Sequence, residues 1–483
     1  MGIRNGKEFI SGLRDGREVW YHGERVADVT TFEPFVEPIK SIARLYDMQH
    51  DPGFADVLVA DSAEFGEPIG RAFEMPRTAY QLRLKREAYI AWAESNCGMM
   101  GRSPDFLNVM MAALAAKRDF FAEGGAERAD AVVNYYRYIA GKDLFLTHAL
   151  LDPQLDKGKL RHEQSDPNIC LKAVDENADG IILNGIKRIA TASPFADEIL
   201  VWPFPPTFQP GEEDYANVFA IPMNSPGLKT ICRPSFTRNG STQDFPLSSR
   251  FDEMDATVVF DEVLVPWDRV FVHKNIALLN RMYRDSRMRE LTAHQTNARL
   301  EVKLGFVYAL VHRLAEAQGI ASKPDVMEML GEAAVKIEVI RSTTRSAELQ
   351  AQKDPSNGLL YPDLYALQAG RALGPVYYPE LVNMVRKMGG GALMQQPVSM
   401  QEFSSPVGPD IEKALRGANV DGQRKTQLLK LAWDVCGSEF GSRHELYEMN
   451  YAGERSALLA GVEREYGRKQ DWLTFLDNFL EAL

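Results

Sequence analysis

The fold class is decided by the stretch Asn168 to Val272, which includes Gly180-Ile181-Ile182-Leu183-Asn184-Gly185-Ile186-Lys187, Glu198-Ile199-Leu200-Val201-Trp202, Val218-Phe219-Ala220-Ile221 and Thr257-Val258-Val259-Phe260. These short runs are rich in β-branched and aromatic residues and are separated by Gly, Pro, Asn and Asp, a pattern typical of strands joined by turns. Their spacing favours an antiparallel barrel or a small sandwich over alternating βαβ units. Such a β module has edges at which ligands commonly bind.

The sequence on both sides of this block is helical. Apolar residues recur at helical spacing in the segments 37–46, 78–99, 127–148, 291–318, 326–350, 364–373 and 380–388. The segment from Arg17 to Thr31 instead suits a hairpin that turns at His22-Gly23-Glu24. The long helices near the C-terminus predict a bundle whose outer faces pack against sister subunits.

Length, charge and cysteine spacing exclude several classes of protein. A chain of 483 residues has room for about three domains. The net charge of −12 opposes nucleic-acid binding, because phosphate recognition needs a basic surface. No apolar run approaches the ~20 residues that span a bilayer, and the first residues lack the apolar core of a signal peptide. Four widely spaced cysteines fit free thiols in a reducing cytosol. We therefore expect a cytoplasmic enzyme without a membrane or nucleic-acid partner.

Several common catalytic motifs are absent from the sequence. No GxGxxG follows a strand and no Walker motif is present, so a nucleotide site of that type is not indicated. The chain has no HExxH motif, its eight histidines do not cluster at ligand spacings, and no GxSxG elbow occurs. We expect no metal centre, although a catalytic triad could still assemble from distant residues.

Arg102 is the first candidate functional residue. It lies in Gly101-Arg102-Ser103-Pro104-Asp105-Phe106, where Ser103 suits an N-cap and Pro104 suits the first helical position. Arg102 would add its charge to the positive end of the helix dipole, which is a favourable place for an anion. The alternative is an ordinary surface arginine.

His148, His294 and Thr191 are the other candidates that the residues themselves indicate. His148 stands at the end of a helical block, and His294 lies within a helical stretch. Either histidine could titrate near neutral pH, but a lone histidine is more often structural. Thr191 ends a strand-like run, where its hydroxyl could face a ligand or cap a turn.

Several longer motifs occur together and in order. They are Asp15-Gly16-Arg17-Glu18-Val19-Trp20, Gly101 to Asp105, Pro246-Leu247-Ser248-Ser249-Arg250-Phe251-Asp252-Glu253, Gly437-Ser438-Glu439-Phe440-Gly441 and Arg443-His444-Glu445-Leu446-Tyr447-Glu448. With them, nearly the whole chain resembles the 4-hydroxyphenylacetate 3-hydroxylase family, the oxygenase components of two-component flavin-dependent monooxygenases.

The resemblance implies a mainly helical α+β fold similar to acyl-CoA dehydrogenase. Its parts would be an N-terminal helical domain (1–144), a middle antiparallel β-barrel domain (145–272) and a C-terminal helical bundle (273–483) for oligomerisation and flavin contacts. Family members are typically homotetramers. They receive reduced FAD from a separate NAD(P)H-dependent flavin reductase, by transient contact or by diffusion, which agrees with the missing nucleotide motif.

The implied chemistry is hydroxylation of a phenol ortho to its OH group. Reduced FAD reacts with O₂ to give a C4a-hydroperoxyflavin, which must be kept from water. Arg102 and His148 would stabilise the ionised phenol, and His148 or His294 would act as general base. The substrate would also contact Phe106, Phe204 and Pro205, in the loop Trp202-Pro203-Phe204-Pro205-Pro206. The resemblance assigns the flavin contacts to Gln154, Leu155, Asp156, Lys157, Thr191, Gly437, Ser438, Glu439 and Phe440.

Two residues depart from the family pattern and leave the substrate open. Phe106 stands where 4-hydroxyphenylacetate hydroxylases carry a tyrosine, so one hydroxyl contact to the substrate is missing. His294 matches a histidine of the branch that acts on chlorophenols and nitrophenols. The substrate could be 4-hydroxyphenylacetate, phenol, another 4-substituted phenol or a tyrosine-derived metabolite, and FMN remains an alternative to FAD.

Two other functions compete with this reading. One is a lyase similar to 4-hydroxybutyryl-CoA dehydratase, whose iron–sulfur cluster needs three cysteines and one histidine. Cys97 and His294 could serve, but position 101 is glycine and no further cysteine follows His294 before Cys436. The other is a non-catalytic helical scaffold, against which the presence of both Arg102 and His148 argues.

Overall fold

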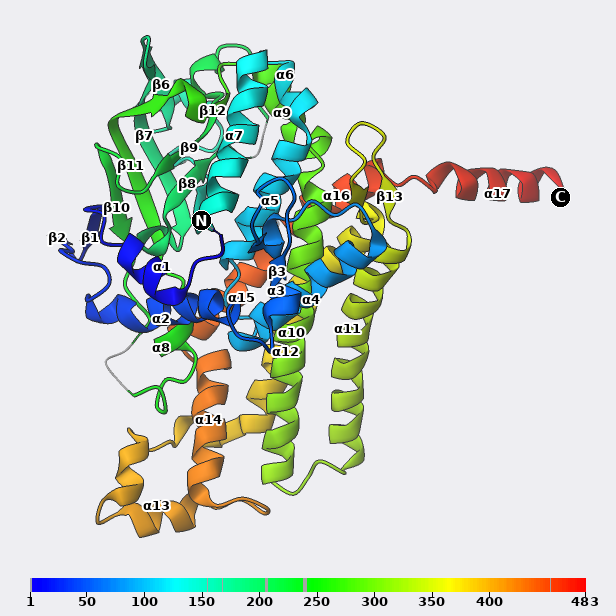
Figure 1. Cartoon of the computed structure of the whole chain (residues 1–483). Helices are drawn as coiled ribbons and strands as arrows, with labels where there is room; N and C mark the ends of the chain where they lie inside the picture. Colours follow the sequence, from blue (N-terminus) through cyan, green and yellow to red (C-terminus); the bar gives the residue numbers. More distant parts are fainter. Residues whose placement is uncertain (1, 154, 167, 205–206, 238–240, 452) are drawn as a thin grey trace.

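The chain folds into a helical N-terminal part, a β region and a long helical bundle. The computed structural model describes residues 2–153, 155–166, 168–204, 207–237, 241–451 and 453–483. In the N-terminal part, the helices are α1 (Gly6–Gly12), α2 (Glu33–Met48), α3 (Ala55–Leu58), α4 (Ala79–Ser95), α5 (Pro104–Ala116), α6 (Arg118–Ala122) and α7 (Ala126–Lys142). Helices α5 and α7 lie against the β region, and α2 crosses below it (Figure 1).

The β region contains two sheets. The larger has the order β2 (Glu24–Arg25), β1 (Glu18–Tyr21), β10 (Leu228–Cys232), β11 (Asp255–Pro266), β7 (Gly180–Thr191) and β6 (Lys172–Glu176). The smaller has the order β12 (Val270–Val272), β9 (Val218–Pro222), β8 (Glu198–Val201) and β5 (Leu146–Ala149). The described pairings leave both sheets open, so they confirm a β module between helical parts but do not show a closed barrel.

Two strand pairings are parallel, unlike the all-antiparallel expectation. β1 runs parallel to β10, and β5 runs parallel to β8. Both β1 and β5 precede the central strand block, so they reach the sheets through long connections instead of tight hairpins. β1 also pairs with β2 as the expected hairpin, with Trp20 opposite Arg25.

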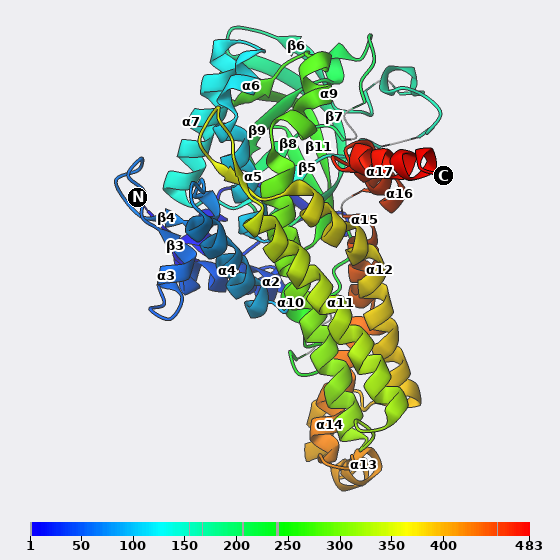
Figure 2. The same ribbon diagram turned by 90° about the vertical axis from the view of Figure 1, so that its right-hand side faces the viewer.

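The C-terminal half is dominated by three long helices that run side by side (Figure 2). They are α10 (Met288–Ala317), α11 (Pro324–Leu349) and α12 (Leu364–Gly389), and α12 joins two segments that the sequence pattern had separated. The remaining elements are α8 (Ser248–Phe251), α9 (Ile276–Asp285), α13 (Gly408–Leu415), α14 (Gly422–Cys436), α15 (Glu439–Asn450), α16 (Arg455–Arg464), α17 (Lys469–Glu481), β3 (Val59–Ala60), β4 (Ile69–Gly70), β13 (Gln352–Lys353) and β14 (Leu360–Tyr361).

The bundle is held by an apolar stripe that follows the helical repeat. Leu300, Leu304, Val307 and Val311 on α10 are fully buried, as are Leu381 and Val385 on α12. Each large aliphatic side chain contributes about 1.5–3 kcal/mol when buried. Among the described residues no helix is both long and apolar enough to cross a membrane.

Candidate active site

Arg102 lies just before α5 and is held by both its backbone and its side chain. Its backbone N–H donates to Glu253 Oε1 at 2.6 Å. Its Nη1 donates to the hydroxyl of Tyr447 at 2.5 Å and to the Gly101 carbonyl at 3.2 Å. The guanidinium carbon lies 4.2 Å from the centre of the Phe106 ring. These contacts fix one buried cation against an aromatic surface, which excludes the alternative of a free surface arginine.

The helix start beside Arg102 differs in detail from the sequence prediction. α5 begins at Pro104 as expected, but Ser103 makes no side-chain cap bond and instead donates to Asp105 Oδ1 at 2.6 Å. Asp105 also accepts from Gln295 Nε2 at 3.1 Å, and burial raises the pKa of its carboxyl. Gly101 is required for packing, because a Cβ there would lie 2.3 Å from the Tyr447 ring.

His148 lies on β5 and not at the end of a helix. The predicted helix over 127–148 stops at Lys142, where Asp143 adopts a left-handed conformation (φ 50°), and the chain then pairs with β8. The His148 ring stacks on Trp202 at 5.5 Å and lies 6.0 Å from Phe106. Its Nδ1 is buried and has no described hydrogen-bond partner.

Electrostatics keep the His148 ring neutral. Burial lowers the pKa of His148 well below its usual value of 6.5, and the positive charge of Arg102 lowers it further. The structure thus places a fixed cation and a neutral imidazole beside the same Phe106 ring. A cation favours the ionised form of a nearby phenol, and a neutral imidazole nitrogen accepts a hydrogen bond from its hydroxyl.

His294 lies in a different environment. It is fully buried on α10, its Nε2 bonds to Glu348 Oε1 at 2.7 Å, and its ring meets the edge of Tyr89. In the part of the chain that the structure describes, no hydrogen bond, ion pair or ring contact links His294 to Arg102 or His148. The structure therefore brings Arg102, His148 and Phe106 together but does not join His294 to them.

Thr191 lies at the end of β7, opposite Asp255 at the start of β11. Its hydroxyl donates to Asp255 Oδ1 at 2.7 Å, and its carbonyl accepts from the Thr147 hydroxyl at 2.5 Å. Asp255 also accepts two hydrogen bonds of 2.7 Å from Arg443 on α15. Thr191 is thereby connected through one carboxylate to the helix that carries Tyr447.

The residues Gly437 to Phe440 form the junction of α14 and α15. Ser438 caps α15 by accepting from the backbone N–H of Gly441, and Phe440 is buried against His444 at 4.3 Å. The opposite end of this helix carries Tyr447, which bonds to Arg102. No described contact joins Gly437, Ser438, Glu439 or Phe440 to Arg102 or His148.

The other predicted contact residues lie in the connections around the β region. Leu155, Asp156 and Lys157 are exposed, and the Asp156 backbone N–H donates to Gln164 at 3.0 Å. Phe204 is half-buried and meets the edge of Tyr283 at 5.7 Å. Gln154 and Pro205 lie outside the described residues.

A buried charge cluster beneath Tyr447 was not assigned from the sequence. Glu448 accepts from Arg299 at 2.8 and 3.0 Å and from Lys303 at 2.9 Å. Burial alone would raise the pKa of Glu448, but Arg299 and Lys303 outweigh it and lower this pKa to about 2. Burial lowers the pKa of Lys303 to about 8 and that of His444 well below 6.5.

This cluster has a recognisable sequence signal. Arg299 and Lys303 stand four residues apart on α10, and His444 and Glu448 stand four residues apart on α15. Side chains at that spacing share one helix face, so two such pairs predict facing charged stripes. The sequence does not say which two helices meet, and that information was needed to combine the stripes.

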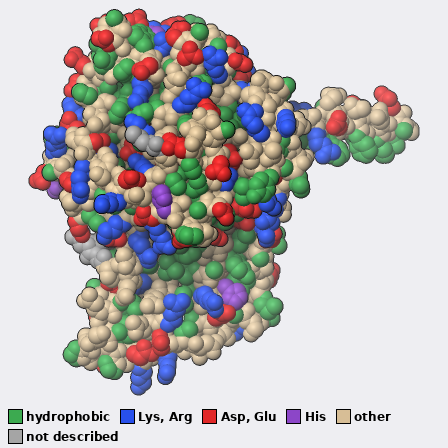
Figure 3. All heavy atoms as spheres, viewed as in Figure 1, with side chains coloured by type: hydrophobic (Ala, Val, Ile, Leu, Met, Phe, Trp, Pro, Cys, Tyr) green, Lys and Arg blue, Asp and Glu red, His purple; other side chains and the backbone are tan. Residues whose placement is uncertain are grey.

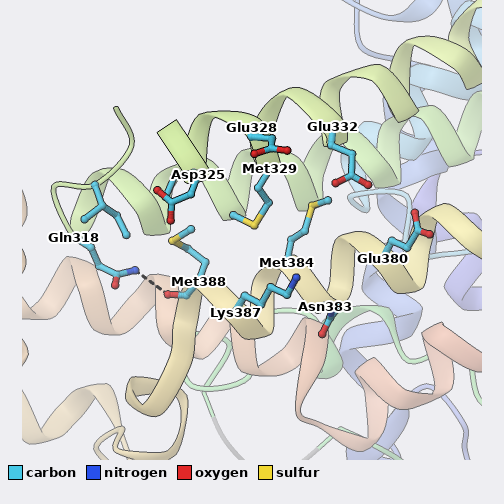
Figure 4. Close-up of a pocket in the computed structure, with 12 residues that line it drawn as sticks. Gln318, Asp325, Glu328, Met329, Glu332, Glu380, Asn383, Met384, Lys387 and Met388 are labelled. Carbon is cyan, nitrogen blue, oxygen red and sulfur yellow. Dashed lines mark hydrogen bonds between the residues drawn. The ribbon is translucent and has the colours of Figure 1, made fainter. Parts of the chain in front are cut away.

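A cavity of about 550 Å³ lies between α11 and α12, in the bundle and away from the β region (Figure 4). Methionines and carboxylates dominate its lining, which includes Met329, Met384, Met388, Asp325, Glu328, Glu332, Glu380 and Lys387. None of the predicted site residues lines it. We therefore place the candidate active site at Arg102 and His148, not in this cavity.

Two polar groups beyond Arg102 and His148 fit a flavin. A flavin dinucleotide carries an anionic diphosphate and ring carbonyls, which cations and N–H groups bind. Lys157 is an exposed cation, and the capped start of α15 presents backbone N–H groups. These groups could hold the cofactor.

Comparison with known proteins gives matches over the whole chain. The family model "4-hydroxyphenylacetate 3-hydroxylase N terminal" matches residues 5–272, and "4-hydroxyphenylacetate 3-hydroxylase C terminal" matches residues 279–480. The chain is 39% identical over 473 residues to the 4-hydroxyphenylacetate 3-monooxygenase oxygenase component of Geobacillus sp. (strain PA-9), covering 96% of this chain and 95% of the relative. It is 35% identical to the oxygenase component of 4-nitrophenol 2-monooxygenase from Rhodococcus sp., covering 94% and 86%.

Solved structures agree with these matches. The oxygenase component of 4-hydroxyphenylacetate 3-monooxygenase, in complex with FAD and 4-hydroxyphenylacetate, superposes with a TM-score of 0.93 at 37% identity, covering 99% of each chain. The 4-hydroxybutyryl-CoA dehydratase from N. maritimus superposes with a TM-score of 0.88 at 21% identity, covering 99% of this chain and 95% of that one. The second likeness shows a common fold alone.

Proposed function

The chain belongs to the 4-hydroxyphenylacetate 3-hydroxylase family, and from this premise we propose that it is the oxygenase component of a two-component monooxygenase. It hydroxylates a phenolic substrate ortho to the OH group with reduced FAD and O₂. Relatives at 31–39% identity with monooxygenase names support this reaction over the lyase, whose representative shares only the fold. The observation that carries the proposal is that Arg102 and a neutral His148 lie beside the same Phe106 ring.

Arg102 is assigned to hold the phenol oxygen in its ionised form. An opposite charge within ~4–6 Å lowers the pKa of an acid by about 1–3 units. A phenol that titrates near about 10, like a tyrosine, would then ionise at roughly 7–9. An ionised phenol has a more electron-rich ring, which is the form that reacts with an electrophilic oxygen. Reduced FAD, when bound, supplies that oxygen by activating O₂.

His148 is assigned to accept the hydrogen bond from the substrate hydroxyl. Because its ring stays neutral, it adds no second charge that would compete with Arg102 for the phenolate. His148 is preferred over His294 as this acceptor, since the Nε2 of His294 is bonded to Glu348. Trp202 and Phe106 cover the His148 ring and keep bulk water from it.

Tyr447 and Glu253 position Arg102. Tyr447 accepts from Nη1, and Glu253 accepts from the backbone N–H. Glu253 Oε2 also accepts from Arg443 at 2.9 Å, and Arg443 lies one helical turn before Tyr447 on α15. Three hydrogen bonds and the shared helix α15 connect these four residues and fix Arg102 relative to the β region.

The proposed assignments for the cofactor and partners follow the family. We infer flavin contacts at Gln154, Leu155, Asp156, Lys157, Thr191 and Gly437 to Phe440, and domain boundaries at 1–144, 145–272 and 273–483. A separate NAD(P)H-dependent flavin reductase supplies reduced FAD, and we propose that both proteins act in the cytoplasm.

A homotetramer is proposed for the assembly. Helix α17 projects from the body and has no buried residue (Figures 1 and 3). Its exposed side chains include Trp472, Phe475 and Phe479. A large exposed apolar face of this kind marks an interaction surface. Deleting residues 469–483 is expected to lower the mass measured by light scattering, whereas an unchanged mass would separate α17 from assembly.

The experiment that tests the function is turnover with a panel of phenols. The purified chain, a generic flavin reductase, FAD and NADH are incubated with 4-hydroxyphenylacetate, phenol and 4-nitrophenol, and diphenol and hydrogen peroxide are quantified. We expect diphenol formation that depends on reduced flavin. Failure to form a diphenol from any of these phenols would refute the proposed reaction.

A further inference from the structure

Arg371 is a buried arginine without an acidic partner. It lies on α12 and is 9% exposed. Its Nη1 donates to the Tyr283 hydroxyl at 3.1 Å, and its Nε has no hydrogen-bond partner. No ion pair joins Arg371 to a carboxylate in the described ranges. The comparably buried Arg299, in contrast, is held by two oxygens of Glu448.

An unmatched buried cation is costly to the folded chain. Removing a charged group from water costs several kcal/mol unless an opposite charge and hydrogen bonds compensate. For Arg299 the compensation comes from Glu448. For Arg371 the described hydrogen-bond partner is a tyrosine hydroxyl and not a carboxylate. The missing negative charge therefore points to an anion that is not part of the described chain.

One series of contacts connects Arg371 to Arg102. Its guanidinium carbon lies 5.9 Å from the Tyr451 ring, Tyr451 stacks on Tyr447 at 5.5 Å, and the Arg102 guanidinium carbon lies 5.2 Å from the Tyr447 ring. The two guanidinium carbons are therefore within about 17 Å of each other. One substituted aromatic ring with a hydrogen bond at each end is compatible with this upper limit.

A second series connects Arg371 to His148 from the other side. Tyr283, which accepts from Arg371, meets the edge of the Phe204 ring at 5.7 Å. The Phe204 backbone N–H donates to the Leu150 carbonyl at 3.2 Å, and Leu150 is two residues after His148. Two series of contacts, both through aromatic side chains, thus connect Arg371 to Arg102 and to the strand that carries His148.

A neighbouring cation is already neutralised. Arg289 lies 5.7 Å from the Tyr283 ring but pairs with Glu465 at 3.0 Å. The side chains of Arg102 and Arg371 both lack a carboxylate partner among the described residues, and Arg102 lies beside His148 at the phenol end of the proposed site. A ligand's carboxylate can therefore approach Arg371 without breaking an ion pair of the chain.

We propose that Arg371 binds the anionic side group of the phenolic substrate, a carboxylate at the position para to the hydroxyl, while Arg102 binds the phenol oxygen. The inference rests on the proposed function, because it takes Arg102 as the phenol end of the site. It makes Arg371 the residue that distinguishes acidic phenols from neutral ones. The diphosphate of a bound flavin is another anion that Arg371 would attract, so the test measures flavin binding separately.

The test compares two ligands that differ in one charge. Binding of 4-hydroxyphenylacetate and of its neutral amide, 4-hydroxyphenylacetamide, to the full chain is measured by calorimetry, with and without oxidised FAD. A charge-assisted hydrogen bond changes affinity by roughly tenfold or more. We expect Arg371→Gln to weaken acid binding by at least about tenfold and to leave amide binding within about twofold. Arg371→Lys should retain part of the preference.

Two further variants separate this role from structural damage. Tyr283→Phe removes the hydroxyl that holds Arg371 Nη1 but keeps the ring against Phe204, so it should reduce the acid preference in part. Arg289→Gln removes the neighbouring cation and should leave the acid-to-amide ratio unchanged. Thermal melting identifies any variant that does not fold, and Tyr283→Phe keeps the proposal testable if Arg371→Gln fails.

Distinct results would overturn the inference. Equal loss of acid and amide binding in Arg371→Gln would make the residue structural. A weakened affinity for FAD with an unchanged acid-to-amide ratio would assign Arg371 to the flavin. These binding measurements need no turnover, so an enzyme that binds the acid through Arg371 but forms no diphenol would refute the proposed function and not this inference.

Discussion

The substitution Tyr447→Phe tests whether the position of Arg102 governs hydroxylation. The change removes one hydroxyl and keeps the ring that stacks on Tyr451. Arg102 Nη1 then loses its 2.5 Å bond and retains the longer one of 3.2 Å to Gly101. We expect the chain to fold, because no buried charge loses a carboxylate partner.

The expected size of the effect follows from the bond that is lost. A hydrogen bond to a charged group contributes about 1.5–3 kcal/mol. If this contribution fixes Arg102 against the phenolate, kcat/KM falls by roughly 10- to 150-fold at 1.36 kcal/mol per tenfold. The pKa of the bound phenol rises by about 1–2 units, since one unit corresponds to 1.36 kcal/mol.

The assay measures two quantities on the same protein. Diphenol formed per NADH consumed gives the coupling of the reaction, and the ultraviolet difference spectrum of bound phenol against pH gives its ionisation. The matched control is Tyr378→Phe, which removes a buried hydroxyl that has no described partner. If Tyr447→Phe retains wild-type coupling and the wild-type pH midpoint of phenol ionisation, the position of Arg102 does not depend on Tyr447. The positioning role proposed for Tyr447 is then wrong.

Four other predictions follow from the site and its surroundings. Arg102→Gln or His148→Asn should release hydrogen peroxide in place of diphenol; normal hydroxylation by either variant would remove its assigned role. Phe106→Tyr should add a hydroxyl beside Arg102 and tighten 4-hydroxyphenylacetate binding by about tenfold, as judged by calorimetry. Glu448→Gln should lower the free energy of unfolding in urea by about 3–5 kcal/mol, because two buried cations lose their partner. The pKa of Glu448 is lowered to about 2, so its contribution to stability is present above roughly pH 4.5 and is lost as the pH falls toward 2. The free energy of unfolding of the variant should therefore depend less on pH between about 4.5 and 2 than that of the wild type. For His148 and His444 the folded pKa is lowered below 6.5, so the unfolded chain binds more protons and thermal stability should fall as the pH drops below about 6.5; an equal melting temperature at pH 5 and pH 7 would contradict this.

Local patterns determined much of the architecture. The strand runs quoted within 168–272 appear as β7, β8, β9 and β11, and the apolar repeats of 291–318 and 326–350 appear as α10 and α11. These features depend on the alternation of side chains along a strand or on the 3.6-residue repeat of a helix, and both are present in a short window of sequence. The start of α5 at Pro104 is another such feature, because proline suits the first helical position.

Other features required the tertiary structure. The pattern extended one helix through His148, whereas pairing with β8 draws that residue into a sheet. A strand partner far along the chain overrides local preference, and it leaves no mark in the sequence near His148. The hydroxyl of Ser103 bonds to the nearby Asp105 instead of capping the backbone, and Gln295 of α10 bonds the other oxygen of that carboxylate.

The sequence by itself determined which chemical groups the site contains: a cation at Arg102, an imidazole at His148 and an apolar ring at Phe106. Only the tertiary structure decided that these three meet, that Tyr447 of α15 fixes the cation, and that Arg371 remains without a carboxylate. The physical reason is that residue type sets the charge and hydrogen-bonding capacity of a side chain. Its distance to partners hundreds of residues away is set by how the helices and sheets pack.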